Sequence, residues 1–251
     1  MSFTIPKGWE ELTQEELHHI VKLLWLYGEN QDWQYKVELA ALLYFCRIEV
    51  VKRTALGWLC RKEETSDTFI LASELLPSML NHVEWVCRTE EMTVRIEQVG
   101  KYKAVDFKLQ ELMFGDYLNA ENYYQAFLSG KDTDSLMGMA RILYGVPDGV
   151  DVPELCDEYL AGAFLWFSAV KNLLGKWFPH FLKPPSDAGM TISRENLRDN
   201  TLAQIRLLTK GDVTKQEYIL EKTDTWTALA ELDAQACEAE EIKRKYSASR
   251  T

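Results

Sequence analysis

The sequence lacks the cysteine pattern of a metal-bound or disulfide-linked protein. Its 251 residues include 5 cysteines, which are widely spaced and form no C-x-x-C pair. This pattern argues against a zinc site and against a disulfide framework. Cys46 ends the apolar run at 43–46, where a reduced cysteine acts as a small hydrophobic side chain. We therefore expect a reducing compartment, the cytoplasm.

Basic residues are also fewer than acidic residues. Lys and Arg number 28 against 39 Asp and Glu, which gives a net charge of −11. A field of this sign repels phosphate backbones, so nucleic acid is not expected as a partner. The short basic stretch Lys243-Arg244-Lys245 is typical of a solvated helix terminus.

No stretch of the chain has the length and apolarity of a membrane span. The longest apolar run, YLAGAFLWFSAV at 159–170, is far shorter than the roughly 20 residues that a bilayer requires. Residues 1–9 contain no basic region followed by an apolar stretch, so we expect no signal peptide. The run at 159–170 instead predicts a buried helix, and no membrane partner is expected.

Motifs of known chemistry are equally scarce. The 4 histidines form no H-E-x-x-H, and adjacent His18 and His19 point about 100° apart on a helix, which prevents them from holding one metal. The glycines form no phosphate-binding loop. Paired acids such as Glu240-Glu241 are typical of a solvated surface. We expect no catalytic residue, no cofactor and no metal, which favours a binding or assembly role.

Hydrophobic and aromatic residues, by contrast, are plentiful. They make up 47% and 12% of the chain, with 8 Trp, which is enough for a substantial core and argues against disorder. The aromatic-rich stretch 112–146 raises the question whether its rings bind a ligand or pack a core. The rings are predicted to pack a core, because apolar residues recur at helical intervals at Leu136, Met139, Ala140, Leu143 and Tyr144.

Several helix ends can be read from local signals. Thr13 with Glu16 forms a capping-box pattern, and Thr214 with Glu217 repeats it. Other predicted ends are an N-cap at Asn119, stops at Gly28 and Gly130, and a left-handed C-cap at Gly211. The predicted helices lie at about 14–28, 32–54, 120–129, from 135 onward, 154–176, 193–210 and 214–246.

These helices predict a mainly α fold, a multi-helix globular bundle. A small β element is expected near residues 92–105, where Met92, Val94 and Ile96 alternate with polar residues and the segment at 102–105 returns as a hairpin partner. Segment 57–68 is expected to be a loop, and segment 68–80 is ambiguous between strand and helix.

A proline-rich break suggests the domain organisation. Pro184-Pro185 and Gly189 interrupt regular structure. They predict a helical main body with the small β insertion at 1–182, followed by a linker and a C-terminal helical pair at 183–251.

The last predicted helix has a thin apolar stripe that includes Ile219, Trp226 and Leu229. A narrow stripe packs either on the body of its own protein or on a partner. Packing on the body is the simpler explanation, and both alternatives remain open from the sequence. These three residues are therefore the candidate partner-binding surface.

Three stretches carry a family resemblance: FTIPKGWEELTQEEL at the start, LQELMFGDYLNAENYYQAFL with LMGMARILYGV in the middle, and LTKGDVTKQEYILEKTDTWTALAELDAQACEAEEIKRKY at the end. Over roughly half of the chain, the pattern resembles small proteins encoded by tailed phages and prophages of Bacteroides-type gut bacteria, often assigned to tail assembly. The resemblance implies a non-enzymatic morphogenesis protein. It implies in particular a tail-assembly chaperone that holds helical segments of the tape-measure protein, and it supplies no catalytic residues.

Three functional hypotheses follow, while the oligomeric state stays open. The first is a tail-assembly chaperone in the host cytoplasm, bound to a tape-measure-like or other tail protein. The second is a structural component of the virion or its connector. The third is an enzyme with an unrecognised acidic site, which predicts a deep pocket with converging acids whose pKa values are perturbed.

Overall fold

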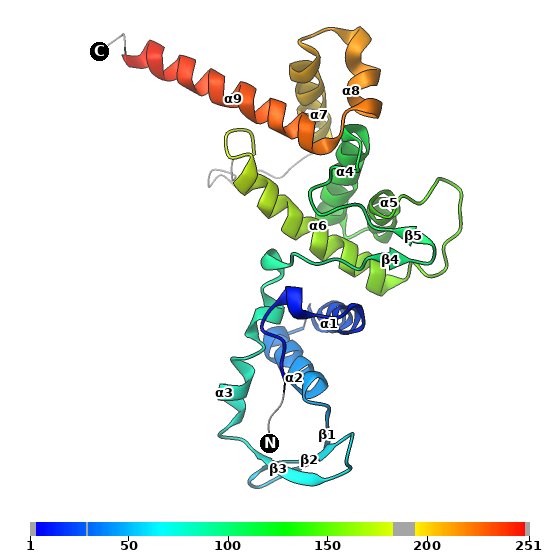
Figure 1. Cartoon of the computed structure of the whole chain (residues 1–251), viewed down its shortest axis with the longest axis vertical. Helices are drawn as coiled ribbons and strands as arrows, with labels where there is room; N and C mark the ends of the chain where they lie inside the picture. Colours follow the sequence, from blue (N-terminus) through cyan, green and yellow to red (C-terminus); the bar gives the residue numbers. More distant parts are fainter. Residues whose placement is uncertain (1–3, 29, 183–193, 249–251) are drawn as a thin grey trace. The chain divides into compact units, whose positions relative to one another are not determined.

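The computed structural model describes residues 4–28, 30–182 and 194–248 (Figure 1). The chain divides into two compact units, unit 1 at Met1–Ile96 and unit 2 at Glu97–Thr251. Over the described residues the fold is mainly α, with one three-stranded and one two-stranded antiparallel sheet. The predicted fold class is therefore confirmed.

Unit 1 begins with two helices, and the start of the first is the predicted capping box. The side chain of Thr13 accepts a hydrogen bond from the N–H of Glu16 at 3.2 Å, and the Glu16 carboxylate accepts one from the N–H of Thr13 at 2.8 Å. This reciprocal pair satisfies two backbone donors that have no partner inside the helix. The elements are η1 (Trp9–Glu11), α1 (Gln14–Tyr27) and α2 (Trp33–Phe45).

A three-stranded sheet follows where the sequence predicted the rest of a helix and a loop. Helix α2 ends at Phe45 rather than near Thr54, and Arg47 takes a left-handed conformation with a φ of 52°. The prediction was wrong here because the apolar run of α2 continues toward β1 and conceals the change from helical to strand periodicity. The strands, in sheet order, are β1 (Ile48–Thr54), β2 (Gly57–Lys62) and β3 (Thr68–Ala72).

The ambiguous segment at 68–80 contains a strand and a helix in turn. After β3, helix α3 (Leu76–Leu80) has Pro77 in its first turn, where a missing N–H costs no helical hydrogen bond. Two short 3₁₀ turns, η2 (Glu84–Cys87) and η3 (Thr89–Glu91), complete the regular structure of unit 1.

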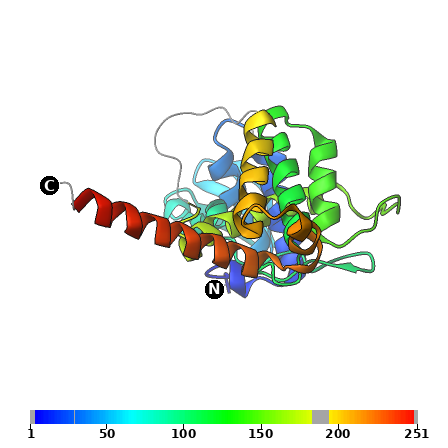
Figure 2. The same ribbon diagram turned by 90° about the horizontal axis from the view of Figure 1, so that it is seen from above.

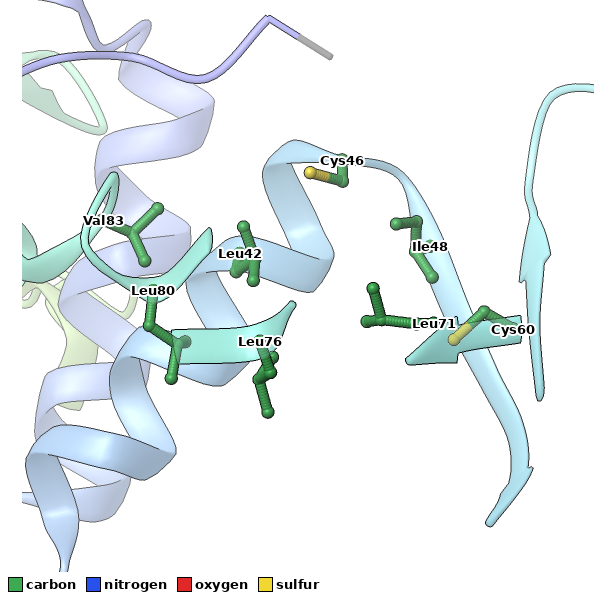
Figure 3. Packing of buried hydrophobic residues seen from close by; sticks show 8 residues of the cluster. All are labelled: Leu42, Cys46, Ile48, Cys60, Leu71, Leu76, Leu80 and Val83. Carbon is green, nitrogen blue, oxygen red and sulfur yellow. The ribbon is translucent and has the colours of Figure 1, made fainter. Parts of the chain in front are cut away.

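A cluster of buried apolar side chains joins this sheet to the helices of unit 1. Figure 3 shows these side chains gathered from α2, the three strands, α3 and the residues just after the two helices. Two of them are Cys46 and Cys60, which are both free and buried. The expectation that Cys46 acts as a small hydrophobic side chain is confirmed. The cluster consists of Leu42, Cys46, Ile48, Cys60, Leu71, Leu76, Leu80 and Val83.

Burial of Cys46 and Cys87 predicts that their thiols react slowly. Burial raises the pKa of the Cys46 thiol from 9.0 to about 11, and burial together with the Glu38 carboxylate raises that of Cys87 to about 12. At about pH 8, a rise from 9 to 11 lowers the reactive thiolate fraction roughly 100-fold. We expect Cys46 to react with a thiol reagent at least about 100-fold more slowly than a small-peptide cysteine, because burial also blocks access.

Mass spectrometry after timed labelling would measure this rate for each cysteine. In guanidinium chloride, which exposes every thiol, Cys46 and Cys87 should react as fast as the peptide. Rapid labelling of Cys46 in the native protein would show that this thiol is not buried.

Unit 2 opens with the small β element expected near residues 92–105. Strands β4 (Gln98–Val99) and β5 (Tyr102–Lys103) form a two-stranded hairpin. The alternating residues that suggested the strand lie just before it, in a segment with no strand assignment, although Met92 and Ile96 are buried. The alternation therefore indicated which side chains are buried, whereas the paired strands lie a few residues later.

The helices of unit 2 begin where long-range contacts allow. Helix α4 starts at Phe114, whose N–H donates to the carbonyl of Thr223 at 2.9 Å. The predicted cap Asn119 therefore lies inside the helix, and that prediction was wrong. The helices are α4 (Phe114–Gly130), α5 (Thr133–Leu143), α6 (Asp157–Trp177), α7 (Arg194–Thr209), α8 (Gln216–Lys222) and α9 (Thr225–Ala248), with η4 (Val213–Lys215) before α8.

The predicted helix at 214–246 is two helices. Thr225 donates its N–H and its hydroxyl to the carbonyl of Leu112, at 2.9 and 2.7 Å, and Asp224 accepts the N–H of Thr227 at 2.9 Å. The two bonds to Leu112 tie the break between α8 and α9 to the segment before α4, and the bond to Asp224 caps the start of α9. At the preceding turn, Asp212 takes the capping role predicted for Thr214.

Most aromatic rings of the stretch at 112–146 pack the core of unit 2, as predicted, whereas Tyr123 is 41% exposed. The ring of Phe164 on α6 lies 5.3 Å from that of Tyr124 and 5.0 Å from that of Phe127. All five residues of the predicted stripe are buried, four on α5 and Tyr144 directly after it. Among the described helices, none has the length and apolarity needed to cross a membrane.

The C-terminal helices pack within unit 2. Helices α7, α8 and α9 each contact α4. The predicted division into 1–182 and 183–251 thus differs from the division after Ile96. The predicted linker falls mostly on 183–193, which lies outside the described residues.

Candidate functional site

The three candidate partner-binding residues lie in different environments. Leu229 is 0% exposed, so a partner would reach it only if α9 were displaced. Trp226 is half-buried, with its ring 5.2 Å from that of Trp177 and 5.1 Å from that of Phe178. Ile219 is half-buried on α8, a separate helix. The structure therefore does not gather the three into one exposed stripe, and their role in binding a partner stays a prediction.

A large hollow in unit 2 lies elsewhere. A groove of about 1110 Å³ runs between α4, α5 and α7, and the loop at 145–148 after α5 forms part of its rim. A smaller hollow of about 470 Å³ shares Asp116, Asn119, Asn122 and Thr201 with it and continues toward α8. The two hollows together make one concave surface along α4.

Helix α4 contributes a polar strip to this groove. Asp116, Asn119 and Asn122 recur at every third residue, which places them on one face of the helix. The opposite face carries buried rings such as Tyr117 and Tyr124. Core packing of these rings therefore fixes the direction in which the carboxylate and the two amides point.

Helix α5 contributes an apolar wall to the groove, and its Gly138 lies close to the ring of Tyr123 on α4. A Cβ atom at Gly138 would lie 2.6 Å from the ring of Tyr123, so a larger residue here would require that ring to shift. Met137 and Ile142 of α5 also line the groove. Leu202 of α7, 50% exposed, adds an apolar side chain from a third helix.

An arginine holds the rim of the groove in place. Arg141 of α5 donates one hydrogen bond to the carbonyl of Val150 at 2.8 Å and another to the carbonyl of Pro147. These contacts tie the loop after α5 back onto the helix. Arg141 thus stabilises the rim of the groove, in addition to any contact that it makes with a ligand.

The lining combines hydrogen-bonding groups with apolar surface. Asp116, Asp134 and Asp148 supply carboxylates, and Arg198 supplies a guanidinium group. Desolvation by burial raises the pKa of Asp116. Within the described ranges, no cluster of three or more His, Cys, Asp or Glu side chains is placed to hold a metal. The lining described includes one aromatic ring, that of Tyr123, and it suits a surface that is itself part polar and part apolar.

Sequence reasoning missed this groove. The polar strip on α4 was visible as a spacing, but Asn119 was assigned to a helix cap, and α7 joins the site across more than fifty residues of chain.

The chain matches no protein-family model, and comparison with curated proteins and with solved structures gave no significant match.

Proposed function

We propose that this chain is a non-enzymatic morphogenesis protein of a tailed phage or prophage. It acts in the host cytoplasm as a tail-assembly chaperone, by binding a helical segment of a tape-measure-like partner. The observation that carries the proposal is the groove between α4, α5 and α7. The family resemblance of the three sequence stretches supplies the biological setting.

The size of the groove supports a polypeptide ligand. Its volume of about 1110 Å³ exceeds the usual range for small-molecule sites, which is about 300–1000 Å³. A helix is about 10–12 Å across and rises about 1.5 Å per residue, so two helical turns occupy roughly 1000 Å³. The groove therefore accommodates about two turns of one helix.

The lining supports an amphipathic helix. Met137, Ile142 and Leu202 offer contacts to an apolar stripe, as in other proteins that bind a helix in a groove. Asn119 and Asn122 supply amide donors and acceptors for polar side chains at the edge of that stripe. Long tape-measure helices expose such stripes before assembly, and covering them would prevent aggregation.

Two leucines of α7 provide a matched test. Leu202 lines the groove and is 50% exposed, whereas Leu207 is 48% exposed and is not among the groove residues. Leu202→Asp is expected to weaken binding of a tape-measure peptide at least about tenfold, since it places a charge in an apolar contact. Leu207→Asp is expected to bind as the wild type does.

Fluorescence anisotropy with labelled peptides that tile the helical partner would measure these affinities. Circular dichroism should show equal helix content in the two variants, because both side chains are half-exposed. Failure of every peptide to bind, or equal binding by the wild type and Leu202→Asp, would contradict the proposed function.

A further inference from the structure

Helix α9 has a face that its own unit leaves exposed. Its first part packs on unit 2 through Leu229 and Leu232, and Asp233 accepts the backbone N–H of His180 at 2.8 Å. From residue 241 to 247 every side chain is exposed. Figures 1 and 2 show the last turns of α9 running out beyond the other helices of unit 2.

The exposed face has an apolar centre. Ile242 is 55% exposed, and Ala239 and Tyr246 are exposed residues on the same side of the helix, three residues before it and four after it. Each residue turns a helix by about 100°, so Ile242 lies roughly a third of a turn from the face that carries Leu229 and Leu232. Ala228, about four turns before Ile242 on nearly the same side, is buried, so Ile242 is exposed because the last turns of α9 extend past the packing of unit 2.

Charges are arranged in two blocks around this centre. Glu238 and Glu241 precede Ile242, whereas Lys243 and Lys245 follow it, and all four charged side chains are exposed. In an antiparallel pair of such helices, the acidic block of one copy faces the basic block of the other, and the helix dipoles also oppose. The surface is thus complementary to a second copy of itself.

We propose that two copies of this chain associate through the C-terminal part of α9, packed antiparallel with Ile242 near the centre. Ala239, Ile242 and Tyr246 form the apolar contact, and Glu238 of one copy lies opposite Lys245 of the other. Two-fold symmetry makes every contact occur twice. An overlap of about 12 residues per helix is small for a dimer interface, so the dissociation constant is expected to be micromolar.

Sedimentation equilibrium on the full chain tests the association. The mass should rise from 29.0 kDa toward twice that value as the concentration is increased. A range of about 5 to 500 µM covers a micromolar constant. Ile242→Asp should hold the mass at that of one chain, whereas Val213→Asp should not, because Val213 is 78% exposed in η4, outside α9.

Charge reversal tests the orientation. Glu238→Lys or Lys245→Glu alone should weaken association about tenfold or more, and the double variant should restore it, because the opposite charges face each other again. Circular dichroism should show unchanged helix content in each variant.

Three results would overturn the proposal: a wild-type protein that stays at one-chain mass, an unaffected Ile242→Asp, or a double variant that does not recover. Restoration by Glu238→Lys with Lys243→Glu instead would mean parallel helices and would overturn the antiparallel arrangement. None of these results bears on the groove, which lies on other helices.

Discussion

Leu229→Ala is expected to lower the free energy of unfolding by about 2–5 kcal/mol. The side chain is 0% exposed at the point where α9 packs on unit 2. Alanine removes the buried methyl groups and leaves a cavity that the surrounding helices fill only in part. Urea unfolding followed by far-ultraviolet circular dichroism would measure the change.

The control for this prediction is Leu207→Ala in the same unit. Leu207 is half-exposed, so its loss should change the free energy of unfolding by less than about 1 kcal/mol. If both variants were equally stable, Leu229 would not belong to the core, and the sequence-based assignment of this residue to a partner surface would regain support.

Gly57→Ala is expected to destabilise the sheet of unit 1 by about 3–5 kcal/mol, the sum of backbone strain and overpacking. Gly57 has a φ of 142°, a conformation that other residues rarely adopt. An added Cβ would lie 2.1 Å from the carbonyl oxygen of Leu71 and 2.9 Å from the Cα of Ala72, both backbone atoms of β3. Neither atom can rotate away, so the pairing of β2 with β3 must distort.

Gly8→Ala is the matched control in unit 1. Gly8 has an extended backbone with a φ of −176°, and no atom lies within 4 Å of an added Cβ. Its replacement should change stability by less than about 0.5 kcal/mol. Hydrogen exchange at the amides of β2 and β3 would localise the damage in Gly57→Ala, and wild-type protection there would contradict the predicted clash.

The sequence predicted best those features that depend on near neighbours. The capping box of Thr13 and Glu16 lies within a single turn. Gly211 is left-handed as expected, with a φ of 80°, although Lys210, with a φ of 53°, takes the first left-handed position after α7. The buried stripe of α5 follows from helical periodicity. In each case the residues that decide the conformation are at most a few positions apart.

Predictions failed where a distant segment decides the conformation. The start of α4 and the break between α8 and α9 hold each other through Phe114, Thr223 and Thr225, across more than a hundred residues. The hairpin of β1 and β2 is a different case, because only two residues separate its strands, and there the apolar run of α2 conceals the change from helical to strand periodicity. The long-range contacts at α4 and α9 leave no local pattern.

The same distinction applies to the candidate sites. Composition and periodicity sufficed to predict a mainly α fold and an aromatic core, because burial of apolar residues follows from hydrophobicity and helical spacing alone. Only tertiary packing buried Leu229 and opened the groove beside Asn119, because it decides which face of each helix a neighbour covers. A helix face is polar or apolar by sequence, but it becomes core or binding surface through what packs against it.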